Sequence, residues 1–355
     1  ALIPAVKELT AKCKEAVEAL GEVEVAAWTA LVQECEDSGA LPNVEAVLSR
    51  VRLKIESAGV GDQPLGLTAP QLKEVERTIR ETIAQIVSLD EDVIPANLPH
   101  DRFALWVKRI TRTQAVEVFT TNYDVLIERA LENARLGVFD GFVGSYRPFF
   151  SPQSVEDDSR MPGAFPVRLW KIHGSVNWEE IDVGGSRRIV RGEPSAEGQL
   201  IYPTHKKYDQ SRKQPYLSLL DRLGHALSGD GALLVTCGFS FGDQHINAAI
   251  LDALDGHPLS HVIALQHGDL VPDSELVKEA MKRPNLMVIG RNAAVVAGIW
   301  GTWRLRELLT DGISQYVDIV FDSYAAPEDE EVALEGQMRV GDFVRFCEFL
   351  NDMGA

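Results

Sequence analysis

Residues 115–131 read AVEVFTTNYDVLIERAL, and the pattern of side chains changes twice within this stretch. The first six residues, 115–120, are mostly β-branched or aromatic, which favours a short strand. A helical spacing of apolar residues begins near residue 124 and continues to residue 136. Thr121, Asn122 and Asp124 lie between the two patterns, where small polar groups either cap a helix or face a ligand at its N-terminus. The stretch therefore predicts a strand, a polar corner and a helix.

The same alternation continues towards the C-terminus. Four further runs are short and rich in β-branched residues, at 167–174, 232–238, 261–266 and 286–290. Helical patterns separate several of them, at 215–228, 244–254 and 273–282. Strands that alternate with helices form a parallel sheet covered on both faces, and ligands bind beyond the carboxyl ends of its strands. We therefore expect an α/β, Rossmann-like fold with its site at that edge.

The chain outside these runs predicts three regions. Residues 1–100 show helical periodicity and should form helical segments packed on the core. Residues 101–322 should form the Rossmann-like domain, with loop insertions near 144–166 and 179–215, where Pro, Gly, Ser and charged residues are frequent. Residues 323–355 should form a linker and a C-terminal helix. That helix is strongly apolar, so it docks either on its own domain or on another subunit, and the sequence leaves both open.

Composition and charge argue against several classes of protein. The 355 residues carry a net charge of −18, and the pI is about 4.9. A duplex-binding domain carries a basic stripe, whereas the nearest basic group here is the short cluster Lys206, Lys207, Arg212 and Lys213. Direct nucleic-acid binding is therefore not expected. No apolar run reaches the roughly 18–20 residues of a membrane helix, and no signal peptide is recognisable, so we expect a cytoplasmic protein.

The cysteines and histidines do not suggest a metal site. Cys13, Cys35, Cys237 and Cys347 show no metal-ligand spacing and are expected to be free thiols, so no structural zinc is expected. Four histidines, at positions 245, 257, 261 and 267, lie close together in sequence. Pro258 prevents two of them from sharing one helical face, so a metal is not expected there either.

Two further strand ends carry polar corners like the one at Asn122. The stretch RLWKIHGSVNWEE, at 168–180, ends a strand on His173, Gly174 and Ser175. The stretch LLVTCGFSFGDQHINAAIL, at 233–251, breaks at Gly238 and enters a helix near Asp243. Glycine allows the backbone to approach a ligand, and a helix N-terminus suits a phosphate or a ribose. Taken alone, each corner is also explained by helix capping or by a hydrogen-bonded core histidine.

Taken together and in this order, the three corners resemble the bacterial sirtuin-like NAD-degrading family. TTNYD, KIHGS with the nearby Trp178, and CGFSFGDQHIN carry the resemblance, which covers roughly residues 100–300. It implies that Asn122 holds the nicotinamide ribose and the attacking water, and that His173 is the general base. The other binding residues that it implies are Thr121, Asp124, Gly174, Ser175, Gly238, Phe239, Ser240, Asp243 and Asn247.

Two features of the family are missing from the sequence. No strand leads into a glycine-rich phosphate loop, so either the chain starts after that loop or the loop is omitted. The paired CxxC motifs of a zinc module are also absent, which favours cleavage of NAD over protein deacylation. The resemblance then implies an NAD+ hydrolase without a metal, used as a toxic effector in bacterial anti-phage defence by abortive infection.

Two other functions and two kinds of partner follow from the same resemblance. NAD-dependent deacylation or ADP-ribosyl transfer is one alternative, and a non-catalytic sensor of ADP-ribose or NAD is the other. Short members of the family work with a separate HerA-type hexameric ATPase. We therefore expect a homo-oligomer and a hetero-complex of this kind.

Overall fold

The structure is a computed structural model that describes residues 2–38, 41–59, 61–161, 163, 165–194, 214–303, 316–320 and 335–353. Residues 323–334 of the region predicted as a linker and C-terminal helix, and the basic cluster at 206–213, lie outside the described residues. Contacts within the chain divide it into two compact units. The first unit comprises Ala1–Ala96 and Thr113–Leu220, and the second comprises Asn97–Arg112 and Asp221–Ala355.

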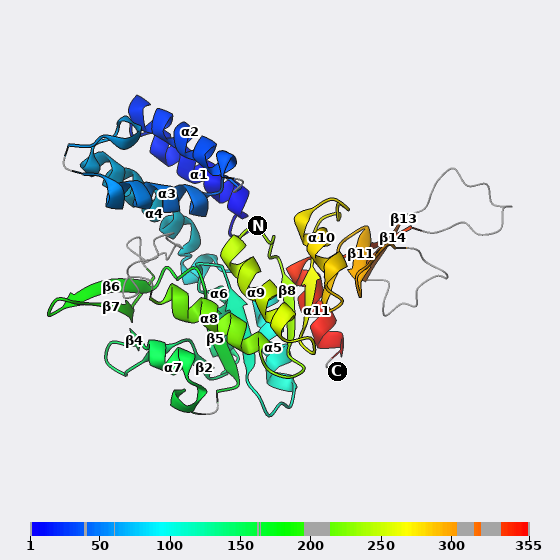
Figure 1. The fold of residues 1–355 in the computed structure, drawn as a ribbon. Coiled ribbons are helices and arrows are strands. Elements are labelled where there is room, and N and C mark those ends of the chain that lie inside the picture. Colours follow the sequence, from blue (N-terminus) through cyan, green and yellow to red (C-terminus); the bar gives the residue numbers. More distant parts are fainter. Residues whose placement is uncertain are drawn as a thin grey trace. The chain divides into compact units, whose positions relative to one another are not determined.

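The first unit begins with four helices that form a bundle, in the region 1–100 where helical segments are predicted. They are α1 (Val6–Glu18), α2 (Glu22–Asp37), α3 (Val44–Ser57) and α4 (Ala69–Val87) (Figure 1). Apolar residues three or four positions apart, such as Leu72, Val75 and Ile79 of α4, are buried in the bundle. A capping box formed by Thr68 and Gln71 begins α4.

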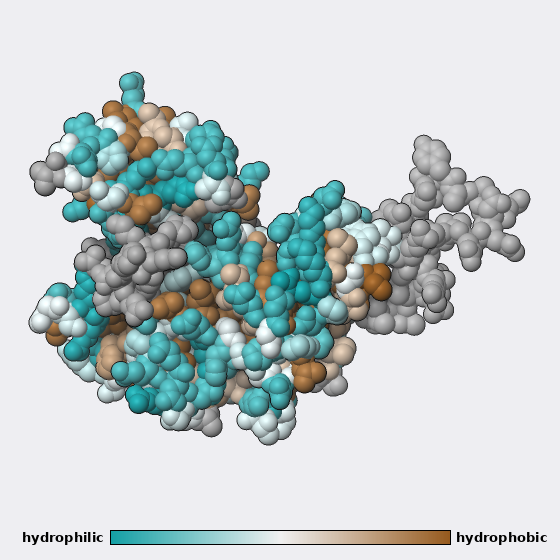
Figure 2. Space-filling model, in the orientation of Figure 1, coloured by the Kyte–Doolittle hydropathy of each residue, from teal (hydrophilic) through white to brown (hydrophobic). Residues whose placement is uncertain are grey.

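The outer surface of this bundle is largely hydrophilic. Figure 2 shows charged and polar residues over most of its visible face, with smaller hydrophobic areas between them. Several surface charges are paired, as in the 2.6 Å ion pair between Arg52 and Glu76 and the 2.7 Å pair between Lys54 and Glu34. The helices are therefore held together by the apolar faces that they turn towards one another.

A small parallel sheet follows the bundle in the first unit. Its order is β1-β5-β2, with β1 at Val116–Thr120, β5 at Val167–Lys171 and β2 at Val138–Phe139. The helix α6 (Leu126–Asn133) leaves β1 after the polar corner. The central strand β5 is almost entirely buried, which explains its continuous run of large side chains. The strands predicted at 115–120 and 167–174 are confirmed.

A four-stranded antiparallel sheet completes the first unit and differs from the expected loops. Its order is β3-β4-β7-β6, with bounds Phe142–Val143, Phe149–Phe150, Ser186–Arg191 and Trp178–Val183. Gly184 and Gly185 have φ of +63° and +80°, which suits the two-residue turn of a hairpin. The sequence does not reveal this hairpin, because charged residues occupy half of the positions in each of its strands. The helix α7 (Pro152–Glu156) follows β4.

The second unit contains a five-stranded sheet in the order β12-β11-β10-β9-β8. The predicted strands at 232–238, 261–266 and 286–290 are confirmed as the parallel strands β8 (Leu233–Cys237), β9 (His261–Leu265) and β10 (Leu286–Ile289). The strands β11 (Ala293–Val296) and β12 (Ile299–Thr302) extend it in the antiparallel direction.

Helices connect the parallel strands of this sheet, as predicted. They are α9 (Gln244–Gly256), between β8 and β9, and α10 (Glu275–Lys282), between β9 and β10, while α8 (Tyr216–Leu227) precedes β8. A separate antiparallel pair joins β13 (Val317–Val320) to β14 (Glu335–Met338). Short 3-10 turns occur at Pro64–Gly66, Glu91–Val93 and Asp158–Arg160. The expected α/β class, with N-terminal helices, parallel strands and a C-terminal helix, is confirmed.

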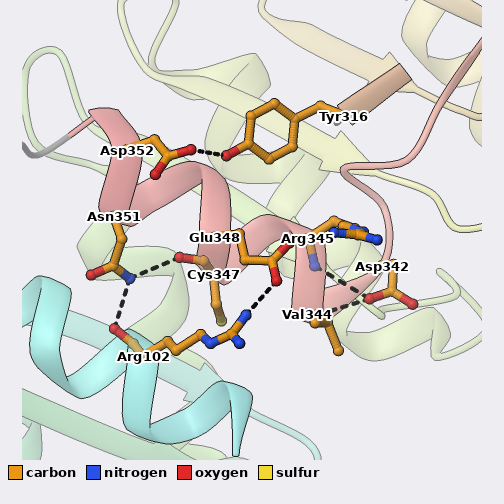
Figure 3. A network of polar contacts seen from close by, with 9 residues as sticks. All are labelled: Arg102, Tyr316, Asp342, Val344, Arg345, Cys347, Glu348, Asn351 and Asp352. Atoms are coloured by element: carbon orange, nitrogen blue, oxygen red, sulfur yellow. Dashed lines mark hydrogen bonds and ion pairs between the residues drawn. The ribbon is translucent and has the colours of Figure 1, made fainter. Parts of the chain in front are cut away.

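The C-terminal helix packs on its own chain, which is the first of the two alternatives for it. Figure 3 shows α11 (Phe343–Met353) against α5 (Pro99–Arg109). Asn351 donates to the Arg102 carbonyl at 2.9 Å, and the Arg102 guanidinium pairs with Glu348. Asp342 caps α11 by accepting from the Val344 N–H at 2.7 Å. No helix in the described part of the chain is long and apolar enough to span a bilayer.

Candidate active site

The polar corners that carry Asn122 and His173 follow two neighbouring strands, β1 and β5, at the same end of the sheet. In the parallel pair of β1 and β5, Thr120 is the register partner of Lys171. Asn122 and His173 each lie two residues beyond this pair, and the Ile172 N–H continues the ladder by donating to the Thr120 carbonyl at 2.9 Å. Because neighbouring strands lie about 4.8 Å apart, the register brings the two corners side by side at the carboxyl edge of the sheet.

One backbone carbonyl ties the two corners together. The Tyr123 carbonyl accepts from the Val176 N–H at 3.0 Å and from the Ser175 hydroxyl at 3.3 Å. The Ser175 side chain is fully buried, so its hydroxyl serves the protein backbone. Tyr123 and Val176 also join the apolar core of the helical bundle. The bundle therefore packs directly against the segments that carry Asn122 and His173.

The buried ammonium group of Lys171, on β5, also holds the two corners together. Lys171 is 2% exposed, donates to the Asp124 carbonyl, and lies 3.4 Å from the Tyr123 carbonyl. Its Nζ also forms a 2.8 Å ion pair with Glu128 of α6. Burial raises the pKa of Glu128, and the adjacent ammonium opposes that rise. Lys171 thus holds the start of α6 against the end of β5.

The three polar residues of the first corner have different surroundings. Asp124 is buried and accepts from the N–H of Leu126, the first residue of α6, at 3.0 Å, so its carboxylate fixes the backbone just before that helix. Asn122 is exposed, and its N–H donates to the Thr120 hydroxyl at 3.1 Å. Thr121 is half-buried. Asn122 is therefore accessible from solvent, whereas the Asp124 side chain holds the backbone of the corner.

His173 is buried and contacts a carboxylate that the sequence analysis did not identify. The imidazole is 4% exposed, and its Nδ1 lies 3.1 Å from Oε1 of Glu45 on α3. The same Glu45 oxygen accepts the Tyr123 hydroxyl at 2.8 Å. Gly174 follows with φ of +86°, a conformation that favours glycine and turns the chain sharply after His173. No sequence pattern predicts the contact between Glu45 and His173, because the two residues lie far apart in the chain.

The third predicted corner lies in the second unit, after β8. Gly238 has φ of +75° and turns the chain out of the strand. Asp243 caps α9 by accepting from two backbone N–H groups at 2.8 and 3.1 Å. The Asn247 amide donates to the Phe241 carbonyl at 2.7 Å, and the Gln266 amide donates to the Phe239 carbonyl at 3.0 Å. Two side-chain amides thus brace this turn, and Ser240 lies within it.

A cavity of the second unit lies elsewhere along the same sheet. It opens between the ends of β9 and β10 and the start of α11, and Arg291, Met338 and Arg345 are among its lining residues. None of the predicted site residues lines it. Among the described residues, no group of three or more His, Cys, Asp or Glu side chains could hold a metal ion. The absence of a structural zinc stays a prediction.

The predicted residues therefore form two groups. Thr121, Asn122, Asp124, His173, Gly174 and Ser175 belong to the first unit, where the β1–β5 register brings their segments together. Gly238, Phe239, Ser240, Asp243 and Asn247 belong to the turn after β8 and to the start of α9 in the second unit. Sequence reasoning missed Glu45, Lys171 and Glu128, although Lys171 stands two residues before His173 within the quoted motif.

A comparison with protein-family models identifies the region that holds both groups. Residues 116–289 match the model described as the SIR2-like domain. No curated protein matches the chain. The matched range begins with the first residue of β1, ends with the last residue of β10 and includes every predicted site residue. It leaves out the helical bundle and α11. The chain therefore carries a SIR2-like domain, a domain of sirtuin-like enzymes that use NAD, over residues 116–289.

Proposed function

We propose that this protein hydrolyses NAD+ to ADP-ribose and nicotinamide. The observation that carries the proposal is the register of β1 and β5, which sets Asn122 and His173 side by side within the SIR2-like range. An exposed carboxamide and a buried imidazole at one sheet edge suit a reaction that must orient a sugar and remove one proton.

The reaction replaces one bond at the anomeric carbon of the nicotinamide ribose. The bond from that carbon to the nicotinamide nitrogen breaks, its electron pair leaves with neutral nicotinamide, and positive charge develops on the ribose. A water oxygen then bonds to the same carbon and gives one proton to His173, which releases it to solvent. Asn122 orients the ribose hydroxyls and the water without adding charge. General-base assistance contributes typically about 10²- to 10⁴-fold to such a step.

The turn after β8 is the second part of the proposal. Gly238, Phe239 and Ser240 receive the ADP-ribose side of the dinucleotide, next to the N-terminus of α9. Asp243 acts there by capping α9, and Asn247 acts by donating to the Phe241 carbonyl of the turn. Thr121, Gly174 and Ser175 shape the nicotinamide side.

The test is a time course of NAD+ with the purified full chain and no acceptor, with nicotinamide and ADP-ribose quantified by mass spectrometry. His173→Ala and Asn122→Ala should each lose most turnover while the melting temperature is kept. His261→Ala and Asn133→Ala, at exposed positions outside both corners, serve as matched controls and should keep the parental rate. NAD+ consumption that requires an acylated peptide, or tight binding without turnover, would contradict the proposal.

The physiological role is proposed from the same resemblance. NAD+ depletion by this enzyme would act as the toxic step of anti-phage defence in the bacterial cytoplasm, within a homo-oligomer bound to a HerA-type hexameric ATPase. Light scattering of the chain alone and of a mixture with such an ATPase tests the assembly, and the NAD+ time course is repeated on each species. A strictly monomeric protein that is active alone and does not bind the ATPase would contradict this role.

A further inference from the structure

A carboxylate of the helical bundle reaches the imidazole of the SIR2-like domain. Oε1 of Glu45 lies 3.1 Å from Nδ1 of His173 and 2.8 Å from the Tyr123 hydroxyl. The rings of Tyr123 and His173 are 6.4 Å apart between centroids. Glu45 lies outside the range that matches the SIR2-like model, whereas the other two residues lie inside it. A carboxylate from one part of the chain therefore contacts the imidazole of another.

The start of α3 fixes where this carboxylate stands. Asn43 caps the helix by accepting from the Ala46 N–H at 2.9 Å, and the Val44 N–H donates to the Thr10 hydroxyl of α1 at 2.9 Å. Val44 is fully buried next to Glu45. A negative charge in the first turn of a helix is also favoured by the helix dipole. The Glu45 backbone is therefore held on both sides, and its side chain is 21% exposed.

We propose that Glu45 is a positioning residue for His173, so that the helical bundle forms part of the catalytic apparatus. This inference rests on the proposed function, because it assigns the second partner of the proposed general base. It goes beyond that function because it gives a residue outside the SIR2-like range a role in the reaction.

The role follows from the two nitrogens of the imidazole. A carboxylate at Nδ1 favours the tautomer with its proton on that nitrogen, which leaves the lone pair on Nε2 to accept a proton. It also stabilises the imidazolium that forms when the attacking water is deprotonated. The Tyr123 hydroxyl holds the carboxylate from a second direction, so that its oxygen stays near Nδ1.

A purely structural role for Glu45 predicts different behaviour. In that case removing the charge would change the melting temperature and leave the tautomer and the turnover of the folded protein unchanged. Glu34 offers a matched control, because it is also a bundle carboxylate and pairs with Lys54 at 2.7 Å, away from His173. Glu45→Gln keeps the size of the side chain and removes its charge, and Glu45→Ala removes the acceptor as well.

The experiment combines NAD+ kinetics with nitrogen-15 NMR of the labelled imidazoles in the full chain. The His173 signals are assigned by their loss in His173→Ala. In the parent protein we expect the Nδ1–H tautomer of neutral His173, and in Glu45→Ala its two nitrogen shifts should move towards each other or exchange. Glu45→Gln should lower kcat roughly 10- to 100-fold with KM changed less than about twofold. Glu34→Gln should change neither property.

The two readouts separate the possible failures. Unchanged imidazole shifts in Glu45→Ala would overturn the inference, and so would parental kcat in Glu45→Gln. A rise in kcat in Glu45→Gln would overturn it too, because the pair would then restrain His173. A parent protein that does not cleave NAD+ would refute the proposed function. The NMR measurement needs no turnover, so it would still decide whether Glu45 sets the state of His173.

Discussion

Replacing Lys171 with methionine should destabilise the first unit more than any surface substitution. Lys171 is 2% exposed and its Nζ lies 2.8 Å from Glu128. Methionine has a similar length but no charge, so Glu128 would remain at a largely buried position without its cation. Breaking a buried ion pair in this way costs about 3–5 kcal/mol. Oε2 of Glu128 is already buried without a hydrogen-bond partner among the described residues, which leaves little compensation.

The assay is urea denaturation of Lys171→Met, Glu128→Gln and the double variant, followed by circular dichroism and tryptophan fluorescence. If the two charges stabilise each other, the double variant should be more stable than the sum of the single losses predicts, by about 2–3 kcal/mol. Hydrogen exchange of residues 120–126 should also accelerate in Lys171→Met, because the ammonium no longer holds the Asp124 carbonyl. A loss below about 1 kcal/mol or strict additivity would refute the reasoning.

The stability deficit of Lys171→Met should also depend on pH, in a direction that the pKa of Glu128 determines. Burial raises the pKa of Glu128, and Lys171 lowers it towards its usual range, so the pKa should rise further in Lys171→Met. A carboxyl group with a raised folded-state pKa contributes stability below its unfolded pKa and loses that contribution as pH rises through the folded value. The deficit of Lys171→Met should therefore be smaller near about pH 4 than near about pH 8. A deficit that grows towards low pH would contradict this account.

Three glycine substitutions test other parts of the structure. A Cβ on Gly341 would stand 2.2 Å from the Gln266 carbonyl oxygen, so Gly341→Ala should cost about 1–3 kcal/mol in thermal unfolding, and an unchanged melting temperature would contradict this contact. Gly224 lies inside α8 with open space around it, so Gly224→Ala should stabilise by about 0.5–1 kcal/mol, and a loss would show that this space is filled. Gly174→Ala should cost about 1–2 kcal/mol because φ is +86°, and a neutral result would show that the turn adapts.

The parts of the fold that the sequence predicts are those with a clear period. The strands at β1, β5, β8, β9 and β10 are buried and rich in β-branched residues, and the helices between them keep an apolar face. The hairpin of β6 and β7 was missed because its strands are charged and mostly exposed, so their alternation carries little hydrophobic signal. The strands β11 and β12 are short, and the turn between them, at Ala297 and Gly298, resembles a loop.

The sequence predicts which strand ends the candidate site occupies, but not the tertiary contacts around them. The rule that ligands bind at the carboxyl edge of parallel strands points to the strand ends that carry Asn122 and His173, whereas the roles of these two residues are implied by the family resemblance. The contacts of Glu45 and Lys171 were not predictable, because they depend on tertiary packing between segments that lie far apart in sequence. From the sequence, a glutamate in the first turn of a helix is explained by its favourable interaction with the helix dipole. Its contact with His173 becomes visible only when the fold places α3 beside that residue.

The central claim is that the corners at Asn122 and His173 hold the nicotinamide ribose of NAD+. An experimental structure of His173→Ala with NAD+ bound tests it most directly, because this variant should bind the dinucleotide without cleaving it. We predict that the nicotinamide ribose lies against residues 121–124, with the Asn122 amide hydrogen bonded to a ribose hydroxyl. A dinucleotide whose ribose lies away from this corner, with Asn122 facing solvent, would contradict the account.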